Sequence, residues 1–106
     1  MTPAQAMDAV AASADGEYGI LLQRGATQIG YYRPRGEDRQ APHDEDEIYI
    51  VHRGNGAFML GGERLPFAAG DVFFVPAGTV HRFVDFSDDF AAWVVFCGAA
   101  DDDASR

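Results

Sequence analysis

The chain has 106 residues, with 17 acidic and eight basic side chains, and its formal net charge is −9. This length suits a single domain with one modest core, and no apolar run approaches the ~20 residues that a membrane span requires. Nucleic-acid binding needs a concentrated positive surface, which this acidic composition argues against. All eight basic residues are arginine, so no side-chain Schiff base can form.

The N-terminal segment predicts a short helix. Thr2 is a suitable N-cap, Pro3 suits the first helical position, and alanine-rich helix formers follow until the chain nears Gly16. The segment has no basic start followed by an apolar stretch, so we expect a cytoplasmic protein. We therefore expect a helix within residues 1–15, one barrel domain over 16–100 and an acidic tail over 101–106.

Short β-rich runs follow, separated by glycine, proline and charged turns. So many runs in fewer than ninety residues predict an all-β sandwich or barrel. The adjacent glycines at positions 61 and 62 predict a two-residue hairpin turn. The runs are EYGILLQ (17–23), ATQIGYYR (26–33), EIYIVHR (47–53), GAFMLG (56–61), ERLPFA (63–68), DVFFVP (71–76), HRFVDF (81–86) and FAAWVVF (90–96).

The apolar residues of these runs predict the core. Cys97 is the only cysteine, which excludes an intrachain disulfide, and its apolar surroundings indicate a buried small hydrophobe. Alternation along the strands predicts two groups. Tyr49, Val51, Val72, Phe74 and Phe83 should line the interior, and Phe58, Leu60, Trp93 and Phe96 should lie between the sheets or in a dimer interface.

The stretch GDVFFVPAGTVHRFVD (70–85) carries the strongest chemical signal. A short strand stops at Pro76, the chain turns through Ala77 and Gly78, and the next strand opens with His81. One long polar loop, residues 34–42, leads directly into a second histidine, His43, and loops at the mouth of a barrel often carry function.

His43 and Glu47 are four residues apart, so in a strand they face the same side. Together with His81 they would form two imidazoles and one carboxylate, a set that binds a divalent transition metal and leaves coordination positions free. His52 has the opposite parity and should face away. Glu45 and Asp85 share the inward parity, so each either accepts a hydrogen bond from an imidazole or faces solvent.

The spacing from Gly70 to Asp85 resembles the second sequence motif of the cupin superfamily. The matching positions are Gly70, Pro76, Gly78, His81 and Asp85, and the last stands where the family usually has asparagine.

The resemblance extends to the first cupin motif. Glu47 followed after six residues by Gly54 fits its second half, and His43 takes the place of the family's second histidine. The place of the first histidine then falls on Ala41. The resemblance, closest to small single-domain bacterial cupins, implies a double-stranded β-helix, the cupin jelly roll, that holds Fe, Mn, Zn or Ni with His43, Glu47 and His81.

Such a site predicts a metal-dependent enzyme, of dioxygenase or isomerase type, acting on a small organic molecule. A non-catalytic module that binds or senses a small molecule or metal, and a metal-free structural cupin, remain alternatives. An anionic substrate would need a local arginine, because the chain is acidic. The residues expected to wall the pocket are Tyr49, Phe74, Phe83 and Trp93.

The resemblance also implies a homodimer, since small single-domain cupins commonly pair through edge strands. The early runs over 17–23 and 26–33 carry few charges that would blunt an exposed edge. The alternative is that the N-terminal helix covers this edge in a monomer.

Overall fold

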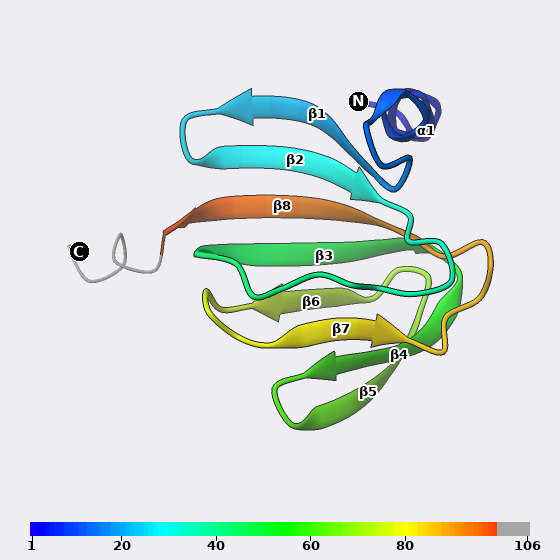
Figure 1. Ribbon diagram of the computed structural model, residues 1–106, viewed down its shortest axis with the longest axis vertical. Coiled ribbons are helices and arrows are strands. Elements are labelled where there is room, and N and C mark those ends of the chain that lie inside the picture. The colour runs from blue at the N-terminus through cyan, green and yellow to red at the C-terminus, as the bar shows by residue number, and fades with distance from the viewer. Residues whose placement is uncertain (100–106) are drawn as a thin grey trace.

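Two antiparallel sheets form the fold of residues 1–99, the part of the chain that the computed structural model describes (Figure 1). The larger sheet has the strand order β1-β2-β8-β3-β6, and the smaller has the order β5-β4-β7. The all-β jelly roll with one N-terminal helix is thereby confirmed, while the expected acidic tail lies outside the described residues. The elements are α1 (Pro3–Ala12), β1 (Tyr18–Arg24), β2 (Thr27–Tyr32), β3 (Glu45–Arg53), β4 (Asn55–Leu60), β5 (Glu63–Ala68), β6 (Val72–Val75), β7 (His81–Val84) and β8 (Ala91–Ala99).

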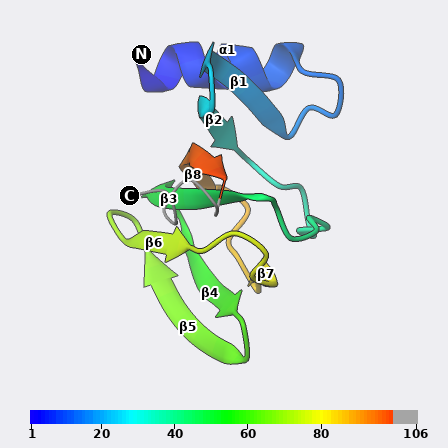
Figure 2. The same cartoon turned by 90° about the vertical axis from the view of Figure 1, so that its left-hand side faces the viewer.

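Helix α1 begins as the sequence predicts. The Thr2 side chain accepts a hydrogen bond from the Gln5 backbone, and the Gln5 side chain accepts one from the Thr2 backbone at 2.9 Å. The helix then lies against β1 at one end of the larger sheet (Figure 2). It comes so close that a Cβ on Gly19 would lie 2.5 Å from the Ala9 backbone, which leaves room only for glycine. No helix in the described part of the chain is long and apolar enough to span a membrane, and the cytoplasmic location stays a prediction.

The main core lies between the two sheets. Tyr49, Val51, Phe58 and Phe83 are buried there, as predicted. Leu60 and Phe96 are partly buried and pack against the same cluster. The aromatic rings make several edge-on contacts, such as Tyr49 with Phe83 at a ring-centroid distance of 4.9 Å. These contacts give the inner face of β3 a rigid support.

The prediction of which face of β6 is buried was wrong, because the alternation is shifted by one residue. Val72 and Phe74 are 61% and 53% exposed, whereas Val75 is buried. Val75 pairs with Glu47 of β3 and Phe74 pairs with Ile48, so Phe74 takes the outer face of the sheet. All four residues of this strand are apolar, so its sequence has no polar alternation that would identify the buried face.

Two residues of β8 also differ from expectation. Trp93 packs in a second cluster on the outer face, where its ring centroid is 5.1 Å from that of Tyr31. Cys97, predicted to be buried, is exposed. It has the same parity as Trp93 but pairs with the exposed Thr27 near the end of the strand, away from the residues that pack against α1.

Candidate functional site

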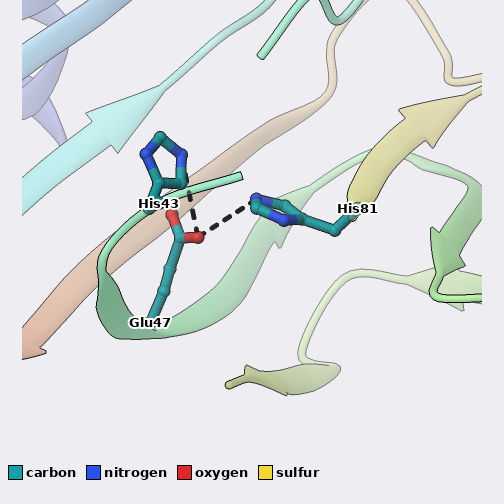
Figure 3. A group of neighbouring side chains, drawn as sticks. All are labelled: His43, Glu47 and His81. Atoms are coloured by element: carbon teal, nitrogen blue, oxygen red, sulfur yellow. Dashed lines mark ion pairs between the residues drawn. The ribbon is translucent and has the colours of Figure 1, made fainter. Parts of the chain in front are cut away.

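His43, Glu47 and His81 meet in the interior (Figure 3). One ligand atom from each residue lies within 4.8 Å of the others. Glu47 is on β3, His81 is the first residue of β7, and His43 lies in the loop before β3. Glu47 and His81 are 1% and 3% exposed, and His43 is half-buried. Segments distant in the sequence thus bring together the three residues that the motif spacing singled out.

The turn before β7 is tied to the segment that carries His43. The Gly78 backbone N–H donates to the His43 carbonyl at 2.8 Å, and the Ala77 N–H donates to the Asp46 carboxylate at 2.8 Å. Gly78 has φ +80°, a conformation that glycine adopts without steric cost. The proline–glycine turn therefore does more than reverse the chain, because it fixes the distance between the two histidine-bearing segments.

Glu47 Oε1 is the most unusual atom of the site. It lies 3.1 Å from His81 Nε2 and 4.0 Å from His43 Nε2, yet it is buried and has no hydrogen-bond partner. The 3.1 Å contact is an ion-pair distance without the angles of a hydrogen bond. A buried carboxylate oxygen without a partner is costly, and a cation between it and the two imidazoles would remove that cost. Two imidazole nitrogens and one carboxylate oxygen are a donor set that suits a divalent transition metal.

The orientation of His81 is fixed by the backbone. Its Nδ1 lies 2.8 Å from the Thr79 carbonyl, which can only accept, so Nδ1 carries the hydrogen and Nε2 faces Glu47. Burial lowers the pKa of His81, but Glu47 and the Thr79 carbonyl together outweigh burial, and the pKa is raised above its usual value of 6.5. Protonated His81 carries a second proton on Nε2, and a metal ion would have to displace that proton in order to bind there.

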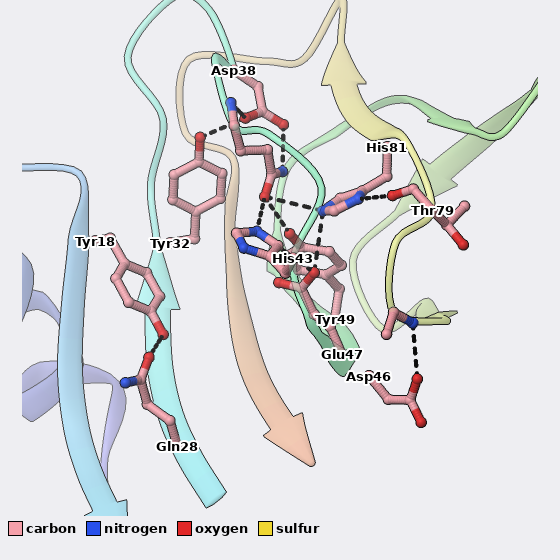
Figure 4. A network of polar contacts seen from close by, with 12 residues as sticks. Tyr18, Gln28, Tyr32, Asp38, His43, Asp46, Glu47, Tyr49, Thr79 and His81 are labelled. Carbon is pink, nitrogen blue, oxygen red and sulfur yellow. Dashed lines mark hydrogen bonds and ion pairs between the residues drawn. The ribbon is translucent and has the colours of Figure 1, made fainter. Parts of the chain in front are cut away.

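Sequence reasoning missed two residues of the loop over 33–44. Gln40 Oε1 lies 3.2 Å from His43 Nε2 and 3.1 Å from His81 Nε2. Asp38, only 1% exposed, accepts a hydrogen bond from the Gln40 side-chain amide at 2.7 Å (Figure 4). The loop has no periodic pattern from which inward positions could be inferred. Ala41, the predicted place of the first histidine, is exposed because this segment is not a strand.

A cavity of about 310 Å³ is lined by Gln40, His43 and Glu47 of this site. Of the predicted pocket residues, Tyr49 lines it, whereas Phe83 lies behind Tyr49 in the core. Phe74 and Trp93 face the other side of the sheet, so their assignment to the pocket was wrong. The aromatic walls that the sequence did not identify are Tyr18, Tyr32 and Phe96, and charged residues at the cavity are Asp15, Glu17, Glu37, Arg39 and Glu47.

The remaining polar candidates lie elsewhere. His52 is on the opposite face of β3 from Glu47, as predicted, and its Nδ1 is 2.5 Å from the Tyr31 hydroxyl. Asp85 is exposed and pairs with Arg64 at 2.7 Å, so it does not orient an imidazole. Its backbone has φ +51°, which interrupts strand alternation directly after β7. Glu45 borders a separate hollow beside His43.

The fold and the histidine–carboxylate cluster define a small jelly-roll domain whose interior suits a metal ion. The family model for the cupin domain matches residues 29–97, and the chain belongs to the cupin family.

Individual relatives agree with this assignment. The chain is 37% identical over 92 residues to the uncharacterized protein SCO3923 of Streptomyces coelicolor, covering 85% of this chain and 88% of that one. A cupin 2 conserved barrel domain protein from Salinispora arenicola is 28% identical, with a TM-score of 0.65 and coverage of 84% and 82% of the two chains. The plu4264 protein of Photorhabdus luminescens has the same fold, with 20% identity, a TM-score of 0.65 and coverage of 74% and 72%.

The raised pKa of His81 predicts a pH-dependent stability of the metal-free protein. A pKa that is higher in the folded than in the unfolded state gives a stabilisation that is complete below about pH 6.5 and is lost as pH rises through the folded-state pKa. Urea unfolding of chelator-treated protein should therefore show a loss of stability across this range. His81→Asn should flatten the dependence, whereas His52→Asn should retain it. Equal slopes in wild type and His81→Asn would contradict the prediction.

Proposed function

We propose that this cupin is a metal-dependent enzyme that acts on a small organic molecule, with His43, Glu47 and His81 as metal ligands. The observation that carries the proposal is the buried Glu47 Oε1, which has no hydrogen-bond partner and lies between two imidazoles beside a cavity. A divalent metal with open positions can hold a substrate and activate oxygen or polarise a carbonyl group. The protein supplies the ligands and an apolar, aromatic wall that limits access of water.

The rim of the cavity favours oxygen chemistry over isomerisation. An isomerase needs a group that moves a proton, but each of three rim carboxylates already has a partner. Asp15 accepts from the backbone N–H groups of Glu17 and Tyr18 at 2.9 and 3.1 Å, and these bonds lower its pKa. Glu17 accepts from the Arg35 backbone at 2.7 Å, and Glu37 pairs with Arg39 at 3.4 Å. A dioxygenase-type reaction, in which metal and oxygen do the bond chemistry, needs no such base.

The charges around the cavity favour an uncharged or cationic substrate. Asp15, Glu17 and Glu37 line it together with a single basic residue, Arg39, which is paired with Glu37. Away from the metal ion, whose own charge would attract an anionic group, an anion would meet a negative field from these lining residues. The tyrosine and phenylalanine walls suit a flat or apolar molecule, and the volume of about 310 Å³ limits it to a small one.

A non-catalytic binding or sensing module is the second candidate. The same partnered carboxylates favour it, since a module that only binds a small molecule or metal needs no free base. The two candidates share the metal site and differ only in turnover.

Metal content tests the ligand set. Protein purified without an affinity tag should contain close to one divalent transition metal per chain, measured by elemental analysis. His81→Ala and Glu47→Gln should lose most of it, because the first change removes an imidazole ligand and the second removes the only negatively charged ligand. His52→Ala is the matched control and should keep the wild-type content, since its ring lies on the opposite face of β3. Equal metal content in wild type, His43→Ala and His81→Ala would show that the site is wrong.

Oxygen uptake separates the enzyme from the binding module. Metal-loaded protein should consume oxygen with at least one uncharged compound from a panel of catechols, diketones and thiols, followed with an oxygen electrode. Glu47→Gln should abolish the uptake. Ligand-induced thermal stabilisation without uptake across the panel would instead support the binding module.

We also propose a homodimer, through a different surface from the one expected at first. Helix α1 packs on the outer face near β1, whereas Ile50, Val72 and Phe74 leave an apolar area exposed on β3 and the edge strand β6. Exposed apolar area next to an unpaired edge is typical of an interface.

Light scattering tests the dimer. Wild type should have twice the chain mass of 11.5 kDa at micromolar concentration. Phe74→Asp should give a monomer and Ile20→Asp, on β1, should not; the reverse result would assign the interface to the β1 edge. A wild-type mass of one chain would exclude the dimer.

A further inference from the structure

We propose that Gln40 is a fourth protein ligand of the metal, through its amide oxygen, and that Asp38 holds this amide in the orientation that binding needs. The inference rests on the proposed metal site. It assigns a ligand that comes from the loop over 33–44 and lies outside both sequence motifs. Gln40 would take the role of the histidine that this chain lacks at position 41.

The direction of the Gln40 amide is fixed by its surroundings. Its Nε2 lies 2.7 Å from Asp38 Oδ2, and since a carboxylate accepts hydrogen bonds, the NH₂ end must face Asp38. The carbonyl end then faces the imidazoles. Asp38 is itself held by the Phe83 backbone N–H, which donates to it at 2.8 Å. It also accepts a hydrogen bond from the Tyr32 hydroxyl at 2.7 Å (Figure 4). Contacts from β2 and β7 therefore fix Asp38, and Asp38 in turn fixes the orientation of the Gln40 amide.

The contacts of Gln40 Oε1 place it beside the proposed metal ligands. It lies 3.1 Å from His81 Nε2, which also lies 3.1 Å from Glu47 Oε1. Because the Nδ1–H of His81 is donated to Thr79, a neutral His81 presents only a lone pair to these two oxygens. Such an arrangement is stable when a positive charge lies between the atoms, either a proton on Nε2 of His81 in the metal-free protein or a bound metal ion in its place. Two ligands bound at about 2.1 Å and at right angles are roughly 3.0 Å apart, so these spacings match donors that share one ion.

Tyr49 supports the same assignment. Its hydroxyl donates a hydrogen bond to Gln40 Oε1 at 2.8 Å. A carbonyl oxygen has two lone pairs, so one can accept from Tyr49 while the other remains for a metal. The hydrogen bond would also fix the position of the ligand atom.

An amide oxygen changes which metals the site prefers. Oxygen ligands suit harder ions such as Mn²⁺, whereas imidazole suits Ni²⁺, Cu²⁺ and Zn²⁺. A set of two imidazoles, one carboxylate and one amide should therefore discriminate less against Mn²⁺ than a set with three imidazoles.

Equilibrium titration of metal-free protein with Mn²⁺ and Ni²⁺ tests this assignment without any measurement of turnover. Gln40→Ala should weaken Mn²⁺ binding by at least about tenfold. Gln40→Met, which keeps the length but replaces the hard oxygen with a thioether, should also weaken it. Gln40→His should increase the preference for Ni²⁺ over Mn²⁺ by at least about tenfold. Ala41→His is the matched control and should change neither affinity, because position 41 is exposed.

The outcomes separate the two proposals. If wild type binds neither metal, the metal site itself is wrong and Gln40 has no such role. If wild type binds Mn²⁺ and both Gln40→Ala and Gln40→Met bind it equally well, Gln40 is not a ligand while the three-residue site stands. Tighter Ni²⁺ binding by Ala41→His, with no change in Gln40→His, would place the fourth ligand at position 41 instead. Circular dichroism and melting of the metal-free variants verify that each is folded.

Discussion

The structure depends most on how the buried Glu47 carboxylate is accommodated. An ionised carboxylate in an aromatic core is tolerated only with a compensating positive charge or several hydrogen-bond donors. The fold brings His43 and His81 toward it and leaves one of its oxygens without a hydrogen-bond partner. The interior of this domain is thus organised around a charge that hydrophobic packing alone cannot satisfy. A bound cation is the simplest group that both satisfies Glu47 and uses the nitrogen lone pairs around it.

The second constraint is the loop that covers the site. It contains no regular secondary structure, so its conformation has to be specified by side chains. Asp38 does this from a fully buried position, accepting hydrogen bonds from Tyr32 on β2, from the backbone of Phe83 on β7 and from Gln40. A substitution at Asp38 would therefore release the loop from both sheets at once, and would alter the site without removing any of its three motif ligands.

The sequence predicted the fold and the three clustered residues because both depend on local patterns. Strand alternation placed Glu47 and Tyr49 correctly, and the Pro76–Gly78 turn set the position of His81. The register of β6 was not predictable, since four successive apolar residues offer no contrast between its faces. Gln40 and Asp38 were missed because a loop has no period, so their inward direction follows only from tertiary contacts.

Strand β3 links the chemistry of the domain to its surface. Its inner face carries Glu47 and Tyr49, while Ile50 on its outer face is part of the exposed apolar area and His52 contacts Tyr31 near α1. Side chains alternate along a strand, so a substitution on one face of β3 leaves the other face unchanged. This independence lasts only as long as the pairing register of β3 stays the same. A shift of one residue would turn Glu47 outward and bring Ile48 or Asp46, depending on its direction, into the position of Glu47. The pairings of β3 with β6 and β8 therefore protect the candidate metal centre and the outer surface through the same hydrogen bonds.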